Sequence, residues 1–360
     1  MEKYIISFGV FPPPTSGQTV SFEKFTRFLS EHFTIIKLDI SPKIKNRNFI
    51  FKLIKTQKWF KSIFILLKYS FKGNLIYLSY DSGRGFYLDF LTQVIGKSLG
   101  YKFVIHHHSY SYINKKQFLY KFITNMIRED SIHIFLCQKM MTSYKEQYGK
   151  IKGMVLNNWF FLDLDLDKIK VRKKNSSKLI LGILSNLTIE KGLTKTIEVA
   201  KELKKRGLNI ELYLAGPIIG EKEEEIKNKI IKDGNNQFIK FLGPVYGEEK
   251  NNLLNEIDIF LFPTNYKNEA MPLVLLEALK EQCYIISAER GCIKEVLSKY
   301  NCIINDIDRY VENTVSQILS LDKSFIREKV TFNIKKIEKD LIFTSQQLDN
   351  ILFEIKELLK

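Results

Sequence analysis

From residue 178 onward the chain alternates between short apolar runs and longer amphipathic segments. The run 178–184 (KLILGIL) is typical of a buried strand, and residues 192–207 have the apolar spacing of a helix that ends at Gly207. The alternation continues and predicts strands at 209–216, 238–243, 258–263, 284–287 and 301–304, with helices from 221, near 247–256 and from 272. Repeated strand–helix units of this kind predict a parallel sheet that is covered by helices on both faces.

The first half of the chain shows the same alternation less regularly. It predicts strands at 3–8, 33–39, 74–79, 102–106, 132–136 and 153–157. Between the halves, residues 163–178 (DLDLDKIKVRKKNSSK) are polar and highly charged, which is typical of a linker. With a length of 360 residues, we expect an α/β protein with two doubly wound domains that face a cleft. Ligands are expected at the carboxyl ends of the strands.

The net charge of +16 is concentrated in the first half of the chain. Residues 1–170 contain 26 Lys and Arg against 12 Asp and Glu, whereas residues 171–360 contain 30 against 28, so the halves carry +14 and +2. Between Asp39 and Asp81 there is no acidic residue, but there are nine basic ones: Lys43, Lys45, Arg47, Lys52, Lys55, Lys58, Lys61, Lys68 and Lys72. This excess predicts an anionic partner for the first half.

Read as a helix, the basic segment has two different sides. One side is an apolar stripe that we expect to face the core, formed by Phe49, Leu53, Phe60, Ile63, Phe64 and Leu67. The other side mixes lysines with large apolar residues, as interfacial helices on anionic lipid do. It gives the expected membrane-contact residues Lys52, Lys55, Lys58 and Trp59, beside Phe51 and Leu66. Nucleic acid is a competing partner, although the sequence contains no recognisable DNA- or RNA-binding module, and a solvated lysine face is the third interpretation.

The stretch NEAMPLVLLEAL (268–279) places Glu269 before an apolar run and Glu277 inside it. Pro272 suits the first turn of a helix, and the amino end of a helix offers N–H groups and partial positive charge to a phosphate. Glu269 lies in the loop before the helix, where it could accept hydrogen bonds from the hydroxyls of a ligand. Because helical side chains lean toward the amino end, the Glu277 carboxylate could reach the same ligand. The alternative is structural, with Glu277 as an ordinary helix residue and Glu269 as a complement to the helix dipole.

Two other loops follow predicted strands of the same half. In SNLTIEKGL (185–193), Lys191 lies next to Gly192 and is a cation beside a backbone that permits close approach to a diphosphate. In LGPVYGEEK (242–250), a Gly-Pro turn follows a strand, where backbone groups could contact a flat base. Each motif is weak alone, because EKG occurs by chance in a lysine-rich chain and a Gly-Pro pair also makes ordinary turns.

Taken together, these motifs resemble the retaining glycosyltransferases of family four, of the bacterial polysaccharide or lipid-linked glycan type, which have the GT-B fold. The segments SNLTIEKGL, LYLAGP, FLGPVYGEEKNNLLNEIDIFLFPT, NEAMPLVLLEAL and ERGCIKEVL occur in the family's order within residues 179–300. The E-x7-E signature with PLVLLEA in its interior is specific. The resemblance implies a hexosyltransferase-type enzyme that moves a sugar from a nucleotide-diphosphate donor to a hydroxyl, with retention at the anomeric carbon and without a metal or other cofactor.

The resemblance also implies roles for single residues. Glu277 would bind the ribose hydroxyls, Glu269 the hydroxyls of the donor sugar, and Lys191 the diphosphate. The expected donor site further includes Ala270, Met271 and Leu273 through their backbone amides, Val245 and Tyr246, Asn186 and Gly17. Asn186 stands where the family usually has an arginine, so Arg290 or a basic residue of the first half would have to compensate.

In the first half of the chain the resemblance is looser. Gly17 in FPPPTSGQTVSF (11–22) lets the backbone approach the diphosphate or the acceptor, and a flexible Pro-rich turn is the alternative. VIHHHSY (104–110) ends a strand, where neighbouring side chains point to opposite faces, so a metal cluster of these histidines is not expected. By resemblance one of them contacts the donor sugar near the anomeric carbon; we choose His108, with His106 second, over a core or surface histidine. The expected catalytic residues are His108, Glu269 and Lys191.

The resulting domain prediction is an acceptor domain at 1–165, a nucleotide-sugar domain at 166–342 and an amphipathic helix at 343–360 that, by resemblance, crosses back to the first domain. Two other functions stay open on this fold: sugar-nucleotide binding without turnover, and sugar-nucleotide epimerisation. A further rival is a DxD metal site at Asp163, Asp165 and Asp167, which lie in the linker.

The sequence contains no run of about 18 apolar residues, the length of a membrane span, and no recognisable signal peptide. We therefore expect a cytoplasmic protein that is peripheral at the inner face of the membrane. Its expected partners are a nucleotide sugar, a glycan or lipid-linked acceptor and an anionic membrane surface, but not nucleic acid.

Overall fold

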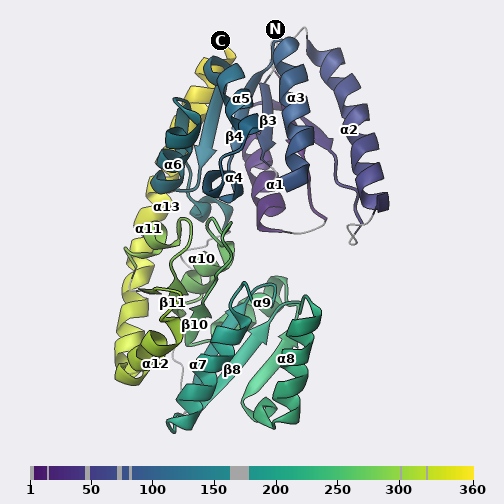
Figure 1. Ribbon diagram of the computed structural model, residues 1–360. Helices are drawn as coiled ribbons and strands as arrows, with labels where there is room; N and C mark the ends of the chain where they lie inside the picture. Colours follow the sequence, from purple (N-terminus) through teal and green to yellow (C-terminus); the bar gives the residue numbers. More distant parts are fainter. Residues whose placement is uncertain are drawn as a thin grey trace. The chain divides into compact units, whose positions relative to one another are not determined.

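The computed structural model describes residues 4–13, 16–44, 49–70, 75–80, 83–162, 178–300, 302–321 and 323–360. The chain forms two compact units, which Figure 1 shows as two groups of strands and helices. Unit 1 comprises Met1–Phe161 and Phe343–Lys360, and unit 2 comprises Leu162–Ile342. The predicted domain boundary at residue 165 lies outside the described residues.

Unit 1 contains a parallel sheet whose described strands have the order β2-β1-β3-β4-β5-β6. These strands are β1 (Tyr4–Gly9), β2 (Thr34–Asp39), β3 (Leu75–Ser79), β4 (Lys102–His106), β5 (Ser131–Phe135) and β6 (Lys152–Val155). The central strands are almost wholly buried, as expected where helices cover both faces of a sheet. Because β2 lies on one side of β1 and the later strands on the other, the topology reverses between β1 and β3. At such a switch point an open α/β sheet binds ligands beyond the carboxyl ends of its strands.

The helices of unit 1 are α1 (Gly17–Ser30), α2 (Phe49–Tyr69), α3 (Phe86–Ser98), α4 (Ser111–Asn114), α5 (Phe118–Met126) and α6 (Gln138–Tyr148). Helix α2 packs on α3, and α3 packs on α5 (Figure 1). Their crossovers run in the same direction across the sheet and are right-handed, so these three helices cover the same face. Helix α1 connects strands in the opposite direction and covers the other face.

Helix α2 forms where the basic segment predicts a helix, but its opposite side faces the core. Its buried residues are Trp59, Ser62 and Leu66, and the indole N–H of Trp59 donates to Thr92 Oγ1 of α3 at 2.8 Å. The predicted core stripe faces outward instead, with exposed fractions of 77% for Phe49, 47% for Leu53, 57% for Phe60, 72% for Phe64 and 45% for Leu67. The prediction of the core side was therefore wrong. Trp59, which is 5% exposed, is not the membrane contact that we expected.

The lysines expected beside Trp59 differ in their surroundings. Lys52 is exposed, whereas Lys55 and Lys58 are half-buried. The ammonium of Lys58 donates to the carbonyl oxygen of Ser41 at 2.5 Å and therefore points to a loop of unit 1. Both sides of this helix are apolar enough to form a core, so periodicity alone does not decide between them.

Unit 2 contains a second parallel sheet, in which the described strands have the order β12-β11-β10-β7-β8-β9. The strands are β7 (Leu179–Leu184), β8 (Ile210–Ala215), β9 (Ile239–Gly243), β10 (Ile259–Phe262), β11 (Tyr284–Ala288) and β12 (Ile303–Asn305). All start within two residues of their predicted positions. The topology reverses between β7 and β10, which are neighbours in the sheet. The predicted α/β class with two doubly wound sheets is confirmed.

The helices of unit 2 are α7 (Leu193–Lys205), α8 (Glu221–Lys232), α9 (Gly247–Glu256), α10 (Leu273–Lys280), α11 (Ile293–Leu297) and α12 (Tyr310–Ser320). Helix α13 (Lys323–Leu359) begins in unit 2 and continues into unit 1. In unit 1, its Thr344 donates to Asn157 Oδ1 at 3.2 Å, and Ile351 and Ile355 are fully buried. Among the residues that the structure describes, none of the helices combines the length and apolar character that crossing a bilayer requires.

Candidate functional site

The switch point of unit 2 brings together two of the expected catalytic residues. Lys191 follows β7 and Glu269 follows β10, so each lies beyond the carboxyl end of one of the two strands where the topology reverses. Lys191 Nζ lies 2.5 Å from Glu269 Oε2. Glu269 is 8% exposed, and its Oε2 also accepts a hydrogen bond from Thr264 Oγ1 at 3.3 Å. Lys191 Nζ lies over the Tyr266 ring, 4.7 Å from its centroid.

A close backbone approach positions this ion pair. Gly192 has a φ of +96°, and a Cβ at this position would lie 2.5 Å from the carbonyl oxygen of Pro263. Glycine alone fits such a position without strain. The Asn265 N–H donates to the Glu190 carbonyl at 2.7 Å, so the loops after β7 and β10 are joined on both sides of the ion pair. Gly192 therefore has a structural role, because it lets the loops after β7 and β10 approach each other closely.

The amino end of α10 lies in the same loop. Pro272 is its N-cap residue and Leu273 its first helical residue, one position later than predicted. Ala270 and Met271 are each 5% exposed. A Cβ on Gly291 would lie 2.2 Å from the Glu269 carbonyl oxygen, so the loop after β11 also packs closely here. The first N–H groups of a helix have no acceptor within the helix, and they carry partial positive charge.

Glu277 lies one turn inside α10 and has a cationic partner of its own. Lys250 Nζ of α9 lies 2.7 Å from Glu277 Oε1, and both side chains are half-buried. Lys250 is the last residue of the LGPVYGEEK motif, but its role was missed in the sequence. The pair joins residues 27 positions apart on two helices, and no local pattern links them.

The remaining donor-site residues of unit 2 have mixed surroundings. Val245 is buried, whereas the Tyr246 side chain is 68% exposed at the amino end of α9. Asn186 is exposed, and its carbonyl accepts from Ser185 Oγ at 3.0 Å. Arg290, the expected compensating cation, donates from Nη2 to Asn265 Oδ1 at 2.5 Å. The structure therefore brings Arg290 to the loop that carries Glu269.

The three consecutive histidines of unit 1 point in alternate directions. His107 Nδ1 lies 3.0 Å from Tyr112 Oη and its Nε2 lies 2.9 Å from His133 Nδ1, so this ring belongs to a buried network. The His106 and His108 rings lie on the other side, with centroids 4.2 Å apart. Within the described chain, the buried Nε2 atoms of His106 and His108 have no hydrogen-bond partner. A buried polar atom without a partner is rare, and it marks a place where a ligand could bind.

Burial sets the protonation of these histidines. Desolvation disfavours the charged ring and lowers the pKa of His108 to about 3. The pKa values of His106 and His107 are held well below the usual range by burial and by neighbouring histidines. Each ring is therefore neutral near pH 7, with one nitrogen as donor and the other as acceptor.

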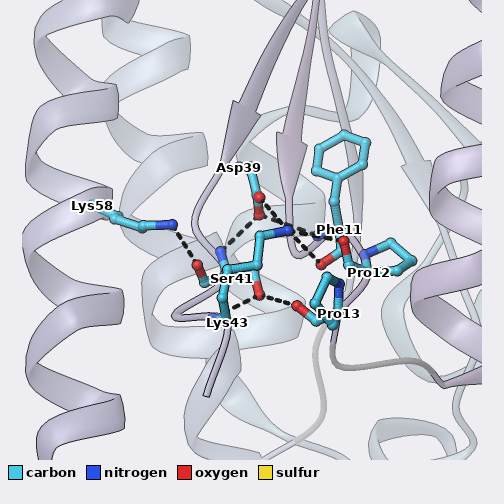
Figure 2. Close-up of polar contacts among 7 residues, drawn as sticks. All are labelled: Phe11, Pro12, Pro13, Asp39, Ser41, Lys43 and Lys58. Atoms are coloured by element: carbon cyan, nitrogen blue, oxygen red, sulfur yellow. Dashed lines mark hydrogen bonds and ion pairs between the residues drawn. The ribbon is translucent and has the colours of Figure 1, made fainter. Parts of the chain in front are cut away.

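The loop after β1 is tied to β2 and α2 by a network of polar contacts, which Figure 2 shows. Asp39 accepts from the N–H groups of Phe11 and Ser41 at 3.3 and 2.8 Å and pairs with Lys43 at 2.8 Å. Ser41 Oγ donates to the Pro13 carbonyl oxygen at 2.7 Å.

Gly17, expected to contact a diphosphate or acceptor, is the first residue of α1 just beyond this loop. Ser16 caps that helix and accepts from the Thr19 N–H at 3.2 Å. The next residue, Gln18, donates to Ser79 Oγ at 3.0 Å and to the Tyr80 carbonyl at 3.1 Å. The first turn of α1 is therefore hydrogen-bonded to the end of β3, the neighbour of β1 at the switch point of unit 1.

The aspartates of the DxD interpretation, Asp163, Asp165 and Asp167, lie outside the described residues. Within the described residues, no three His, Cys, Asp or Glu side chains are grouped so that they could hold a metal ion.

The sequence of unit 2 matches a known family. Residues 166–323 match the model for glycosyl transferases group 1, and the matched range includes Lys191, Lys250, Glu269 and Glu277. The chain carries a glycosyltransferase group 1 domain. The expected enzyme class, a glycosyltransferase, is confirmed. None of the curated proteins matches the chain.

Solved structures with similar folds cover nearly the whole chain. Anabaena HepE in complex with UDP and glucose has 15% identity and a TM-score of 0.68, over 98% of this chain and 99% of that one. Sucrose-phosphate synthase from Thermosynechococcus elongatus has 12% identity and a TM-score of 0.69, over 99% and 100%. A trehalose-6-phosphate synthase, studied for glycosyl transfer with retention, has 8% identity and a TM-score of 0.66, over 98% and 99%. At these identities the likeness shows the fold, and the expected GT-B fold is confirmed.

Proposed function

We propose that this glycosyltransferase transfers a sugar from a nucleoside diphosphate donor to a hydroxyl of a glycan or lipid-linked glycan, with retention and without a metal. The observation that carries the proposal is the Lys191–Glu269 pair at the switch point of unit 2, beside the amino end of α10. This arrangement offers a cation, a buried carboxylate and helix N–H groups within one loop system.

Each of these groups suits one part of a nucleotide sugar. The Lys191 ammonium and the N–H groups near Ala270, Met271 and Leu273 suit the diphosphate, whose negative charge grows as the glycosidic bond breaks. The buried Glu269 carboxylate suits the hydroxyls of the sugar, since each of its oxygens accepts hydrogen bonds. Glu277 lies on α10, and Lys250 Nζ lies 2.7 Å from its carboxylate. This carboxylate suits the two ribose hydroxyls.

The proposed step exchanges one bond for another. The bond between the anomeric carbon and the diphosphate oxygen breaks, and its electron pair leaves with the diphosphate. A bond from the acceptor oxygen to the anomeric carbon forms on the same face of the sugar. The leaving phosphate oxygen takes the acceptor proton, so the step needs no protein nucleophile and releases a nucleoside diphosphate.

For unit 1 we propose that the neutral His108 donates or accepts one hydrogen bond at the donor sugar. The support is its buried Nε2, which has no partner among the described residues. His107 is a weaker choice, because both of its ring nitrogens already have partners.

We also propose that the protein acts at the inner face of a membrane on a lipid-linked acceptor. The support is the charge asymmetry, with +14 on residues 1–170 and +2 on residues 171–360. Anionic lipid attracts such a surface by about 1 kcal/mol for each Lys or Arg close to it.

The test is to incubate the purified protein with nucleotide sugars and to follow the products. UDP-glucose is the first donor to try, since HepE is known in complex with it. A ligand at about 100 times its Kd should also raise the free energy of unfolding by about 2.7 kcal/mol. Release of UDP, and a product with the anomeric configuration of the donor, are the expected results; excess EDTA should leave the rate unchanged.

The other outcomes separate the alternatives. Binding of the donor without release of UDP, with or without acceptors, would indicate a binding protein without turnover. The uncharged Asn186 is the reason to consider this alternative. An altered sugar that is still attached to UDP would indicate an epimerase. If EDTA abolishes the activity and manganese restores it, the linker aspartates would be favoured as a metal site.

A further inference from the structure

The outward side of α2 is the most unusual surface of unit 1. Five large apolar side chains between 45% and 77% exposed lie on it: Phe49, Leu53, Phe60, Phe64 and Leu67. We call this set the apolar stripe. At 3.6 residues per turn, its members fall within about 60° of one another around the helix axis. Successive members are spaced by three, four or seven residues, as on the apolar face of an amphipathic helix.

The stripe is not a side effect of how α2 packs. The core side of the helix, with Trp59, Ser62 and Leu66, is already buried against unit 1. That side lies about 140° from the centre of the stripe, at 100° per residue. The helix therefore has two apolar sides, and only one of them packs against the residues of unit 1 that the structure describes. Large contiguous apolar surface of this kind marks an interaction site.

The neighbouring helices continue this surface. Tyr87 and Leu91 of α3 are 57% and 43% exposed, and Phe118 and Phe122 of α5 are 78% and 47% exposed. Each pair is spaced by four residues and so lies on one side of its helix. Because α2, α3 and α5 pack side by side on one face of the sheet, their outward sides face the same way (Figure 1).

The charges around this surface are positive. Lys52, Lys61 and Lys68 of α2 are exposed, and so is Lys121 of α5. The one acidic residue in the sequences of α2, α3 and α5 is Asp89, which is 6% exposed. Apolar side chains flanked by lysines, with no exposed carboxylate on these three helices, complement an anionic lipid surface, which accepts the apolar groups and attracts the ammonium groups.

We propose that the apolar stripe of α2 inserts into the headgroup region of an anionic membrane, with the outward sides of α3 and α5 beside it. This inference deepens the proposed function, since it rests on an acceptor held at a membrane. The inserted residues lie on the side of α2 opposite to Trp59. The exposed lysines Lys52, Lys61 and Lys68 form the positively charged flank of the stripe.

Docking through α2 would fix the switch point of unit 1 at the membrane. The Lys58 ammonium of α2 donates to the Ser41 carbonyl oxygen at 2.5 Å, and Ser41 Oγ donates to the Pro13 carbonyl oxygen at 2.7 Å (Figure 2). Lys43 Nζ donates to the Pro12 carbonyl oxygen at 2.9 Å. These contacts connect the docking helix to the loop that precedes Gly17. A lipid-linked acceptor in the same membrane would then meet a loop of fixed position.

The experiment measures sedimentation with vesicles of phosphatidylglycerol and phosphatidylcholine, and with vesicles of phosphatidylcholine alone. The stripe variant carries Phe60→Ser, Phe64→Ser and Leu67→Ser. A matched control carries Ile219→Ser, Ile231→Ser and Leu319→Ser, which are exposed apolar positions of unit 2. A charge variant carries Lys52→Glu, Lys61→Glu and Lys68→Glu. All of these positions are exposed, so each variant should fold, and far-UV circular dichroism checks this.

The wild-type protein and the control should bind the anionic vesicles alike. The stripe variant should lose about 100-fold in partitioning, from partial burial of three large apolar side chains. The charge variant should lose binding at low salt, and at 1 M salt, where the Debye length is about 3 Å, the wild type should approach it. In a Phe64→Trp variant, brominated lipid should quench the added fluorescence.

Equal binding of the stripe variant and the wild type, or no binding to anionic vesicles at low salt, would overturn the proposal. A wild-type dimer without vesicles that the stripe variant dissociates would instead make a second copy of the chain the occupant of the stripe. UDP release, measured without vesicles, separates the two proposals. If the protein binds vesicles but releases UDP from no donor, docking stands and the proposed function is wrong. If it releases UDP but does not bind vesicles, only docking is wrong.

Discussion

The carboxyl ends of the strands carry different chemistry in the two units. In unit 2 the site residues are ions that neutralise one another, since Lys191 pairs with Glu269 and Lys250 pairs with Glu277. In unit 1, His106 at the end of β4 and His108 just beyond it are held neutral by burial. The same kind of sheet edge thus offers charges in one unit and neutral hydrogen-bonding groups in the other.

The surfaces of the two units differ in charge in the opposite way to their sites. Unit 1 has neutral histidines at the end of β4, but its outer surface is rich in exposed lysines around the stripe of α2. The second half of the chain is nearly neutral overall, although it contains the Lys191–Glu269 and Lys250–Glu277 ion pairs. The comparison teaches that the charge of a region and the chemistry of its site are set separately. Net charge predicts which surface meets a partner, whereas burial and pairing decide what a site can bind.

The largest effect is expected from removing the cation of unit 2. Lys191→Gln keeps a hydrogen-bond donor beside Glu269 but removes the charge that faces the leaving diphosphate. Loss of one such stabilising group lowers kcat by about 10²–10³-fold. Steady-state UDP release measures this, and Lys195→Gln, on the first turn of α7, is the matched control. A loss below about tenfold would mean that the site does not depend on this charge.

Substitution of the two glutamates of unit 2 should have separate effects, one on binding of the nucleotide and one on turnover of the sugar donor. Glu277→Ala should weaken binding of free UDP by about 10- to 150-fold, because hydrogen bonds to a charged acceptor contribute about 1.5–3 kcal/mol. Glu269→Ala should leave the Kd of UDP unchanged and lower turnover of the UDP-sugar. Calorimetric titration gives the Kd values, with the exposed Glu256→Ala as control. Similar losses of UDP affinity in both variants would contradict the assignment.

Unit 1 should lose stability in mild acid. Burial lowers the folded-state pKa of His133 to about 3, against about 6.5 for an unfolded histidine. Below pH 6.5 the unfolded chain therefore binds a proton that the folded chain does not, and stability falls as the pH falls. Between pH 7 and pH 5, this one histidine should lower the free energy of unfolding by about 2 kcal/mol.

His133→Asn should remove that share of the pH dependence, whereas His32→Asn, at an exposed histidine, should not. Both tryptophans of the chain, Trp59 and Trp159, are buried in unit 1, so their fluorescence during urea unfolding reports on this unit. An unchanged slope of stability with pH in His133→Asn would show that this ring takes up protons in the folded state.

The smallest effect is expected at His108. A single neutral hydrogen bond contributes about 0.5–1.5 kcal/mol, so His108→Ala should lower kcat by up to about tenfold. Because its pKa is about 3, the ring stays neutral from pH 5 to 8, and the pH–rate profile should keep its shape in the variant. His106→Ala is the control on the same side of the strand end. If His106→Ala alone lowers kcat, the choice between the two rings was wrong.

The sequence by itself determined the strands, the α/β class and the two sheets, because apolar periodicity follows directly from burial on two faces. It also indicated Lys191 and Glu269, since these follow predicted strands and parallel strands bring their carboxyl ends to one edge, and it placed Glu277 inside the helix that follows Glu269. Their ion pairs were not visible. Lys250 and Glu277 come from two helices, and only packing of those helices sets the distance between them.

The tertiary structure alone decided which side of α2 is buried. Phe49, Phe60 and Phe64 form the more regular apolar stripe, yet Trp59 and Leu66 face the core. The Trp59 indole finds an acceptor in Thr92 of α3 and the Lys58 ammonium finds the Ser41 carbonyl, and both partners lie far along the chain. Periodicity records that a helix has an apolar side, but which of two such sides enters the core depends on partners that only the fold supplies.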